Sequence, residues 1–309
     1  MPLINQELTS RSYNNRIGYG TYKAILRVRK DIYELSAGFT EDCYIMKTDI
    51  KGFFPNIKWE PVYKAMEDLI LRRYTGNDIE EILWLLKVSL YADPASNCER
   101  KGDTSLWKLI DPNKSLFTKE SGVGGAIGWL VWQMSMTYYL VTLDRRLEKI
   151  TYIRFVRFVD DIIIIGKDKE KTLKVMETVR DTVKSLNCEL NESKFYFQHY
   201  TKGLEFLGTR IKFDRLYLNN KTINRMFVKI NFLNSICNKQ ENIEHTQQVF
   251  NSYMGMLKTR NEFNIIWDTI IFKIDNDWWR FLFFNWERGC FKIRKEYLPN
   301  KHIKRIYEL

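Results

Sequence analysis

The chain has 309 residues, 45% of them hydrophobic and 15% aromatic, which is enough to bury a large core divided among two or three subdomains. A net charge of +11 favours nucleic acid over a membrane surface as a partner, although an ordinary basic protein can carry the same excess. Five scattered cysteines without C-x-x-C spacing and three dispersed histidines exclude a zinc motif and a disulfide framework. This cysteine usage fits a reducing compartment and the polar N-terminus shows no signal peptide, so we expect a cytoplasmic protein.

Two segments in the first hundred residues have clear patterns. CYIMKTDIKGFFPNI, residues 43–57, predicts a strand that ends at Asp49, ahead of a glycine and a proline that break it. Residues 77–90 predict a helix, with Asn77 as its N-cap and Glu80 completing a capping box.

Residues 121–143 carry no charge over a length that could span a bilayer. The run opens with SGVGGAIG, however, and contains polar side chains such as Gln133. We therefore interpret it as a glycine-rich loop followed by a buried helix over residues 129–148, and we expect no membrane partner.

RFVRFVDDIIII, residues 154–165, places two adjacent carboxylates between two apolar, β-prone runs and predicts a hairpin. Continuous apolar runs are typical of strands buried on both faces, and ionised carboxylates near such a core are costly unless they are paired or bind metal. Two interpretations stay open on this stretch alone. Asp160 and Asp161 form either a metal site or a polar turn.

The later elements favour an α+β fold. Residues 168–187 predict an amphipathic helix, two short strand-like pieces follow, and the character changes to helices near Asn219. This order fits an antiparallel sheet with helices on one face better than alternating βαβ units. The domain ranges that we predict are 1–40, 41–215 and 216–309.

A carboxylate at the end of a neighbouring strand would strengthen the metal interpretation, and Asp49 is in that position. Mg²⁺ takes hard oxygen ligands, and two such ions about 3.5–4 Å apart stabilise the attacking and leaving oxygens of a phosphoryl displacement. A strand-end aspartate together with Asp160 and Asp161 is what that chemistry needs.

With these residues in place, the chain resembles the reverse transcriptases. DIKGFFP, residues 49–55, resembles the first palm motif of that family, in which the aspartate and the backbone of the next residue, Ile50, bind metal. FVDD, residues 158–161, resembles the catalytic hairpin, with phenylalanine where tyrosine is usual. The resemblance implies a right-hand polymerase: residues 41–215 as a ferredoxin-like palm, 216–309 as a helical thumb, and 1–40 as partial fingers and their junction with the palm.

The resemblance also assigns roles residue by residue. Catalysis falls to Asp49, Asp160, Asp161 and Lys194, the last as a candidate proton donor to the leaving pyrophosphate. Phe54 matches the aromatic that excludes a ribose 2′-OH, and Phe53, Gly128 and Arg16 join it around the dNTP. The implied template and primer contacts are Ile127, Gln133, Phe206, Leu207, Gly208, Lys221, Arg225 and Lys229. The implied cofactor is two Mg²⁺ ions, with Mn²⁺ as a substitute.

Within the family the chain most resembles the reverse transcriptases of diversity-generating retroelements. Residues 93–117 look like a stretch that those enzymes carry, Ile127-Gly128 and Gln133 echo their template-loop pattern, and residues 251–263 resemble their thumb motif. Implied partners are template RNA, primer, cDNA product, dNTPs and a basic helical accessory variability protein, in a bacterial or phage-encoded system. A retron-like or group II-type enzyme active in phage defence, or an inactive RNA-binding relative, stays as an alternative.

Two departures from the family pattern add expectations. Trp132 stands where the pattern has serine, which places a large ring near the expected template base. We expect the family's N-terminal fingers strands, whose basic residues grip the triphosphate, to be missing, through truncation or because a separate chain supplies them. We therefore expect poor extension with a high KM for dNTP, with Arg16 and Lys23 as partial substitutes.

The C-terminal region carries basic surfaces. Lys221, Arg225 and Lys229 step by four along a predicted helix, and residues 292–309 hold six basic and two acidic side chains. A solvated helix face is the common explanation of such a stripe. Beside a polymerase palm, we favour phosphate contacts with the template–primer duplex.

Overall fold

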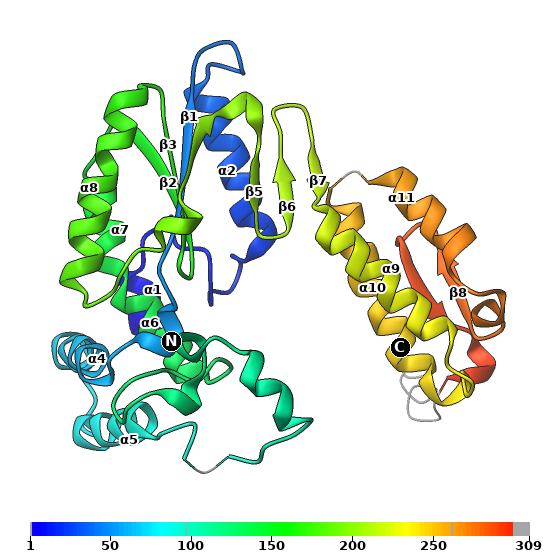
Figure 1. Cartoon of the computed structure of the whole chain (residues 1–309), viewed down its shortest axis with the longest axis horizontal. Helices are drawn as coiled ribbons and strands as arrows, with labels where there is room; N and C mark the ends of the chain where they lie inside the picture. Colours follow the sequence, from blue (N-terminus) through cyan, green and yellow to red (C-terminus); the bar gives the residue numbers. More distant parts are fainter. Residues whose placement is uncertain (1, 97, 261, 299–309) are drawn as a thin grey trace. The chain divides into compact units, whose positions relative to one another are not determined.

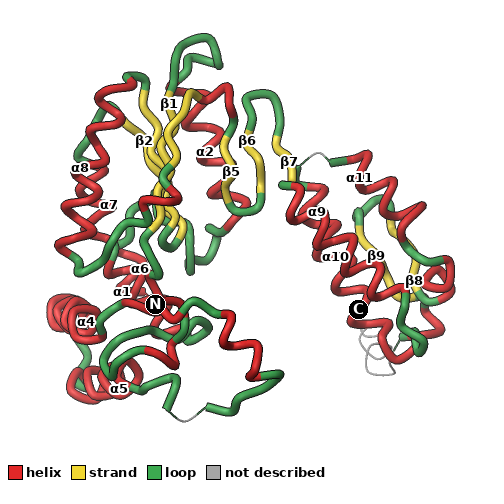
Figure 2. Tube along the Cα trace, in the orientation of Figure 1, coloured by secondary structure: helices red, strands yellow, loops and turns green. Residues whose placement is uncertain are grey.

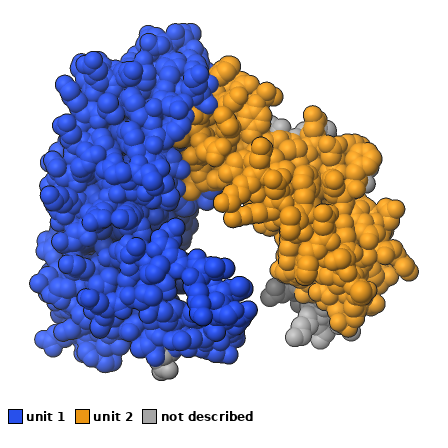
Figure 3. Space-filling model, viewed as in Figure 1, with its two compact units in different colours: residues 1–202 blue, residues 203–309 orange. Residues whose placement is uncertain are grey.

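The computed structural model describes residues 2–96, 98–260 and 262–298. The chain forms two compact units, residues 1–202 and 203–309, which Figure 3 shows in different colours. The division between Lys202 and Gly203 comes earlier in the chain than the boundary near residue 216 that the sequence predicted. Residues 299–309, which include most of the predicted basic C-terminal stretch, lie outside the described residues, as do Asn97 and Asn261.

A four-stranded antiparallel sheet organises the first unit (Figure 2). Its strand order is β2-β3-β1-β4, with the predicted Asp-Asp hairpin formed by β2 and β3 beside the predicted strand β1. The strand bounds are β1 (Tyr44–Asp49), β2 (Ile153–Phe158), β3 (Asp161–Gly166) and β4 (Tyr196–His199). The α+β class predicted from the order of elements is confirmed.

Helices cover both faces of this sheet, which corrects the expectation of helices on one face. Met46, Ile162 and Ile164 belong to one core cluster with the buried face of α8 (Lys169–Ser185). Side chains alternate along a strand, so Ile45 and Ile163 point to the other face, where α2 (Thr21–Leu35) contacts β2 and β3. The apolar run in β3 is therefore buried on both faces because each face has its own helix (Figure 1).

The uncharged run forms a buried helix, as predicted, but the helix is broken. α6 (Leu130–Tyr139) and α7 (Val141–Glu148) meet at Leu140. Across the described residues, no helix is long and apolar enough to cross a membrane. Trp132 is fully buried, and its ring packs so closely on Gly125 that a side chain at position 125 would clash with it. The ring therefore fills the core and does not face a template base.

The remaining helices of the first unit are α1 (Pro2–Glu7), α3 (Phe53–Asn56), α4 (Trp59–Arg73) and α5 (Ile79–Tyr91). The helix predicted over 77–90 exists, but its capping box does not. Asp78 is the N-cap, and its carboxylate accepts a hydrogen bond from Tyr74 at 2.6 Å in place of an amide of the first turn. Short 3-10 turns at Thr104–Leu109, Pro112–Lys114 and Leu116–Thr118 punctuate the long loop that follows α5.

The second unit begins with a three-stranded meander and continues with helices. Its core gathers α9, α10 and a second β-hairpin, β8–β9, around Phe250 and Trp278. The sequence predicted only helices here, so this hairpin was missed. The bounds are β5 (Leu204–Phe206), β6 (Thr209–Ile211), β7 (Leu216–Leu218), α9 (Asn220–Asn234), α10 (Ile243–Lys258), α11 (Phe263–Asp268), β8 (Leu282–Asn285) and β9 (Cys290–Ile293).

Candidate active site

The register of the sheet brings Asp49 and Asp161 together. They are directly opposite each other at the ends of β1 and β3. The backbone carbonyl of Asp49 bonds to Asn191 N at 2.8 Å, on the β4 side, so the pair across β1 and β3 is of the non-hydrogen-bonded type. In such pairs the Cα atoms approach to about 4.5 Å and the side chains are close on one face. Both carboxylates therefore project from the face opposite α8.

Asp160 occupies the tip of the β2–β3 hairpin. Phe158 and Asp161 are the closing pair, so the turn itself has only two residues, Val159 and Asp160. Of these two, only Val159 has a positive φ, at 58°, a pattern that normally requires glycine at the first turn position. The tight turn holds Asp160 next to Asp161 and beside the end of β1.

Two lysines partly balance the three carboxylates. Lys194 Nζ lies 2.6 Å from Asp49 Oδ2, and Lys47 Nζ lies 3.4 Å from Asp161 Oδ1. Burial, together with the nearby charge of Asp49, raises the pKa of Asp160 to about 7. Burial also raises the pKa of Asp161, against the opposing charge of Lys47. A cluster that resists ionisation in this way favours a bound cation.

The donor set fits a divalent cation of the magnesium type. Asp49 and Asp160 offer carboxylate oxygens. On either side of Ile50, the Asp49 carbonyl and the Lys51 N–H bond to the backbone of residues 189–191. Because these groups alternate along an extended chain, the Ile50 carbonyl points the other way, toward β3. Among the described residues no three acidic, histidine or cysteine side chains are grouped closely enough to enclose an ion by themselves. This is expected of Mg²⁺, which usually completes its shell with water and substrate phosphates.

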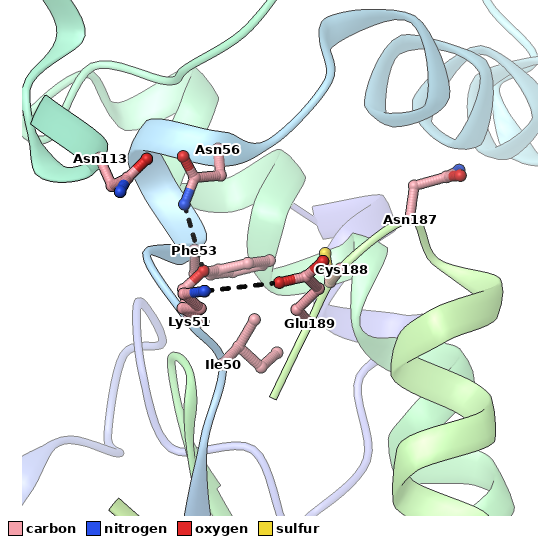
Figure 4. Close-up of a pocket in the computed structure, with 8 residues that line it drawn as sticks. All are labelled: Ile50, Lys51, Phe53, Asn56, Asn113, Asn187, Cys188 and Glu189. Carbon is pink, nitrogen blue, oxygen red and sulfur yellow. Dashed lines mark hydrogen bonds and ion pairs between the residues drawn. The ribbon is translucent and has the colours of Figure 1, made fainter. Parts of the chain in front are cut away.

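A pocket lies next to the residues that follow β1. It has a volume of about 290 Å³ and is lined by Ile50 and Lys51 directly after β1, by α3, by the loop between α8 and β4 and by Asn113 of the long loop (Figure 4). Asn56 donates a hydrogen bond to the Lys51 carbonyl at 3.4 Å, and Lys51 Nζ lies 3.7 Å from Glu189. Gly52 has a φ of 52°, which favours glycine, and a Cβ there would displace the Asn56 amide.

The two phenylalanines after Gly52 have different environments. Phe53 is buried in the core at 3% exposure and meets the half-buried Phe54 edge to face at 5.9 Å. The Phe54 carbonyl accepts a hydrogen bond from Gly125 N at 2.8 Å, which ties it to the glycine-rich loop containing Ile127 and Gly128. Ile127 is 76% exposed on that loop. The structure therefore brings the predicted nucleotide aromatic and the predicted template loop together.

Arg16 has a structural use. Its guanidinium donates to the carbonyls of Thr9 and Ser12 at 2.7 and 3.1 Å and stacks 3.9 Å from the ring centroid of Tyr19. Lys23 donates to the Gly18 carbonyl in the same turn. Both cations contact the segment that enters α2, and the triphosphate role that the sequence suggested for them stays a prediction.

The predicted template and primer residues of the second unit lie on two of its elements. Phe206 is buried, and Leu207 and Gly208 form the β5–β6 turn, both with positive φ. Lys221, Arg225 and Lys229 line one face of α9, which also exposes Val228 and Phe232.

Sequence reasoning missed several residues that shape the site. Lys47 shares a face with Asp49, and the two-residue strand period was sufficient to find it. Asn14 and the buried ion pair between Arg157 and Asp144 brace the hairpin. A charged residue within an apolar strand was a signal for Arg157, but no local pattern marks Asn14.

Comparison with known proteins identifies the family. Residues 22–211 match the family described as reverse transcriptase (RNA-dependent DNA polymerase), and this range covers more than half of the chain. The chain belongs to the reverse transcriptases, which are nucleotidyltransferases. No curated protein matches the sequence.

Solved structures with a similar fold include telomerases. Apo telomerase from Candida tropicalis aligns at 14% identity with a TM-score of 0.50, over 82% of this chain and 43% of that chain. Telomerase from the same organism in complex with the TWJ fragment of telomeric RNA aligns at 14% identity with a TM-score of 0.49, over 83% and 45%. At these identities the likeness concerns the fold alone. This chain spans less than half of either telomerase chain.

Proposed function

We propose that the chain is an RNA-directed DNA polymerase that copies template RNA into cDNA by two-metal nucleotidyl transfer. The observation that carries this proposal is the meeting of Asp49, Asp160 and Asp161 at one end of the sheet, with a raised pKa at Asp160. Bound Mg²⁺, or Mn²⁺ in its place, supplies charge stabilisation to the attacking and leaving oxygens. Asp49, Asp160 and the Ile50 carbonyl are the groups that hold the ions.

The other residues of the site have separate tasks in this proposal. Phe54 sets the space beside the nucleotide sugar, so that a 2′-OH meets its ring. Lys194 carries its proton at neutral pH, because the hydrogen bond to Asp49 raises its pKa, and its side chain is 61% exposed and able to turn. Its Nζ is therefore the proton donor that we assign to the leaving pyrophosphate.

We assign the chain to a diversity-generating retroelement of a bacterium or phage, acting in the cytoplasm. The support is the sequence pattern at Ile127-Gly128 and Gln133 together with the long loop over residues 93–120, one of whose residues, Asn113, lines the pocket. Its partners in this proposal are template RNA, primer, dNTPs, cDNA and a basic helical accessory protein. α9 is the surface that we assign to the template–primer duplex, through Lys221, Arg225 and Lys229.

The test is primer extension on a defined RNA template with purified protein, Mg²⁺ and the four dNTPs, followed by sequencing of the product. Template-dependent cDNA supports the proposal, and its stimulation by the accessory protein supports the retroelement assignment. Binding of RNA without extension would instead identify a non-catalytic relative. Extension that the accessory protein leaves unchanged would favour a retron-like or group II-type enzyme.

A further inference from the structure

The tip of the catalytic hairpin has a backbone conformation that its sequence disfavours. Val159 has a φ of 58°, and a β-branched residue in the left-handed region is strained. A conformation of this kind persists only where surrounding groups impose it. Because the turn has just two residues, any relaxation at Val159 displaces Asp160, the next residue along the chain.

Asn14 supplies one of these constraints. It is 3% exposed, and its amide oxygen accepts the backbone N–H of Val159 at 3.1 Å. Its amide nitrogen donates to Thr137 Oγ1 at 2.6 Å, and that hydroxyl donates to the Gln133 carbonyl at 2.7 Å. A single side chain thus ties the hairpin tip to α6, the helix that carries Gln133.

Arg157 supplies the second constraint, from the other side of the same residue. Its Nη1 donates to the Val159 carbonyl at 3.1 Å. The guanidinium is itself fixed, because Nε and Nη2 bond to the two carboxylate oxygens of Asp144 at 2.6 and 2.7 Å with both side chains fully buried. Both hydrogen-bonding groups of Val159 are therefore held by buried side chains.

We propose that Asn14 is a positioning residue of the polymerase: it holds Val159 in the left-handed conformation and thereby places the Asp160 carboxylate for metal binding. This inference rests on the proposed function. It assigns a catalytic consequence to a residue that lies 145 positions before the turn that it holds. Asn14 itself contacts the hairpin backbone and α6, and acts only through them.

The proposal makes a specific prediction for a double-mutant cycle. Asn14→Ala removes the hydrogen bond and should lower the single-turnover rate of dNTP incorporation about tenfold, with little change in primer–template affinity. Val159→Gly removes the cost of positive φ, since glycine has no Cβ. In the Val159→Gly background, the same Asn14→Ala change should therefore cost less than about threefold.

The chain offers a matched control. Ser36 Oγ accepts the N–H of Phe39 at 2.9 Å, and Phe39 also has a positive φ, at 72°, in a turn ahead of the first residue of β1. Ser36→Ala removes an equivalent hydrogen bond at the other end of the strand from Asp49 and should leave the incorporation rate unchanged. If Asn14→Ala folds poorly, Thr137→Val serves in its place. This nearly isosteric change removes the hydroxyl that accepts the Asn14 amide hydrogen bond, without leaving a cavity, and should lower the incorporation rate about threefold.

Amide hydrogen exchange of the hairpin peptide provides a measurement that needs no activity. Faster exchange around Val159 in Asn14→Ala, absent in Ser36→Ala, supports the proposal that Asn14 holds the turn. A wild-type chain that incorporates no nucleotide would reject the polymerase function, and the exchange result would still stand. An active wild type with an Asn14→Ala variant of equal rate overturns the proposal. So does an equal loss in the wild-type and Val159→Gly backgrounds, because Asn14 would then act through general stability.

Discussion

Arg157 of the β2–β3 hairpin and Asp144 form a fully buried, two-point ion pair, with N–O distances of 2.6 and 2.7 Å. Arg157 belongs to β2 and Asp144 to α7, so the pair joins the sheet to the helix that covers one of its faces. Burial raises the pKa of Asp144, and the Arg157 charge opposes that rise. The hairpin therefore presents Asp161 on one face while this ion pair anchors it from the other.

Removing one partner of this pair should destabilise the first unit strongly. Asp144→Asn leaves the Arg157 charge buried without a counter-charge, which typically costs about 3–5 kcal/mol. Chemical denaturation of wild type and variant measures the difference. Asp181→Asn, at an exposed site on α8, is the control and should change stability by less than about 0.5 kcal/mol. A decrease of less than about 1 kcal/mol in the free energy of unfolding of Asp144→Asn would show that water solvates the Arg157 charge when its counter-charge is removed.

Phe54 should control the choice of sugar. Replacing it by alanine removes the ring that we place against a 2′-OH, so ribonucleotide incorporation relative to deoxyribonucleotide should rise by about tenfold or more. Phe54→Tyr keeps the ring and should keep the preference. The measurement is the ratio of kcat/KM for a matched rNTP and dNTP. An unchanged ratio in Phe54→Ala would make Phe54 a packing residue, like its neighbour Phe53.

Lys194 should act in the chemical step. Lys194→Met keeps most of the side-chain volume but removes the proton, and loss of a general acid typically lowers the rate about 10²-fold or more. Single-turnover incorporation with saturating dNTP measures this, and primer–template affinity serves as the internal control. A Lys194→Met variant with the wild-type rate would show that Lys194 is not the general acid and serves only in the ion pair with Asp49.

The raised pKa of Asp160 predicts a pH-dependent link between metal and stability. The folded-state pKa of about 7 lies above the usual 3.8, so the folded protein binds this proton more tightly than the unfolded chain does. The stability that this carboxyl contributes is fully present below about pH 4 and is lost as the pH rises through 7. Mg²⁺ competes with the proton, so its binding should raise the melting temperature more at pH 7.5 than at pH 5.5.

Thermal melts with and without Mg²⁺ at the two pH values measure this link. Asp160→Asn provides the comparison, because an amide cannot titrate and should reduce the pH dependence of the Mg²⁺ effect. An equal stabilisation by Mg²⁺ at both pH values in the wild type would contradict the assignment of Asp160 as a ligand.

Much of the first unit was predictable because its signals are local. The strand ending at Asp49 and the hairpin around Asp160 follow from apolar runs and their breaks, and β1 pairs with β3 as the metal interpretation required. The same apolar runs also indicated that the strands are buried on both faces, although we had expected helices on only one face of the sheet. The break at Leu140 has no glycine or proline to signal it, and the capping box gives way to a hydrogen bond between Tyr74 and Asp78, four positions apart.

What could not be predicted depends on contacts between distant parts of the chain. Asn14 meets Val159 across 145 positions, and no residue near Asn14 indicates this. The β8–β9 hairpin had a signal that composition obscured: aromatic, β-prone residues on either side of Gly289, which has a φ of 61°. From the sequence, Arg16 was a candidate to bind the triphosphate. In the structure its guanidinium contacts the carbonyls of Thr9 and Ser12 and the ring of Tyr19, and no local pattern predicts these contacts.

The most direct test of the polymerase assignment compares Asp160→Asn with Asp181→Asn in RNA-templated dNTP incorporation. Both changes replace a carboxylate by its amide, but only Asp160 lies at the hairpin tip between β2 and β3. With Mg²⁺ present, we expect no detectable incorporation by Asp160→Asn and the wild-type rate for Asp181→Asn, with equal primer–template affinity in both. Incorporation by Asp160→Asn at the wild-type rate would show that Asp160 is not a catalytic metal ligand.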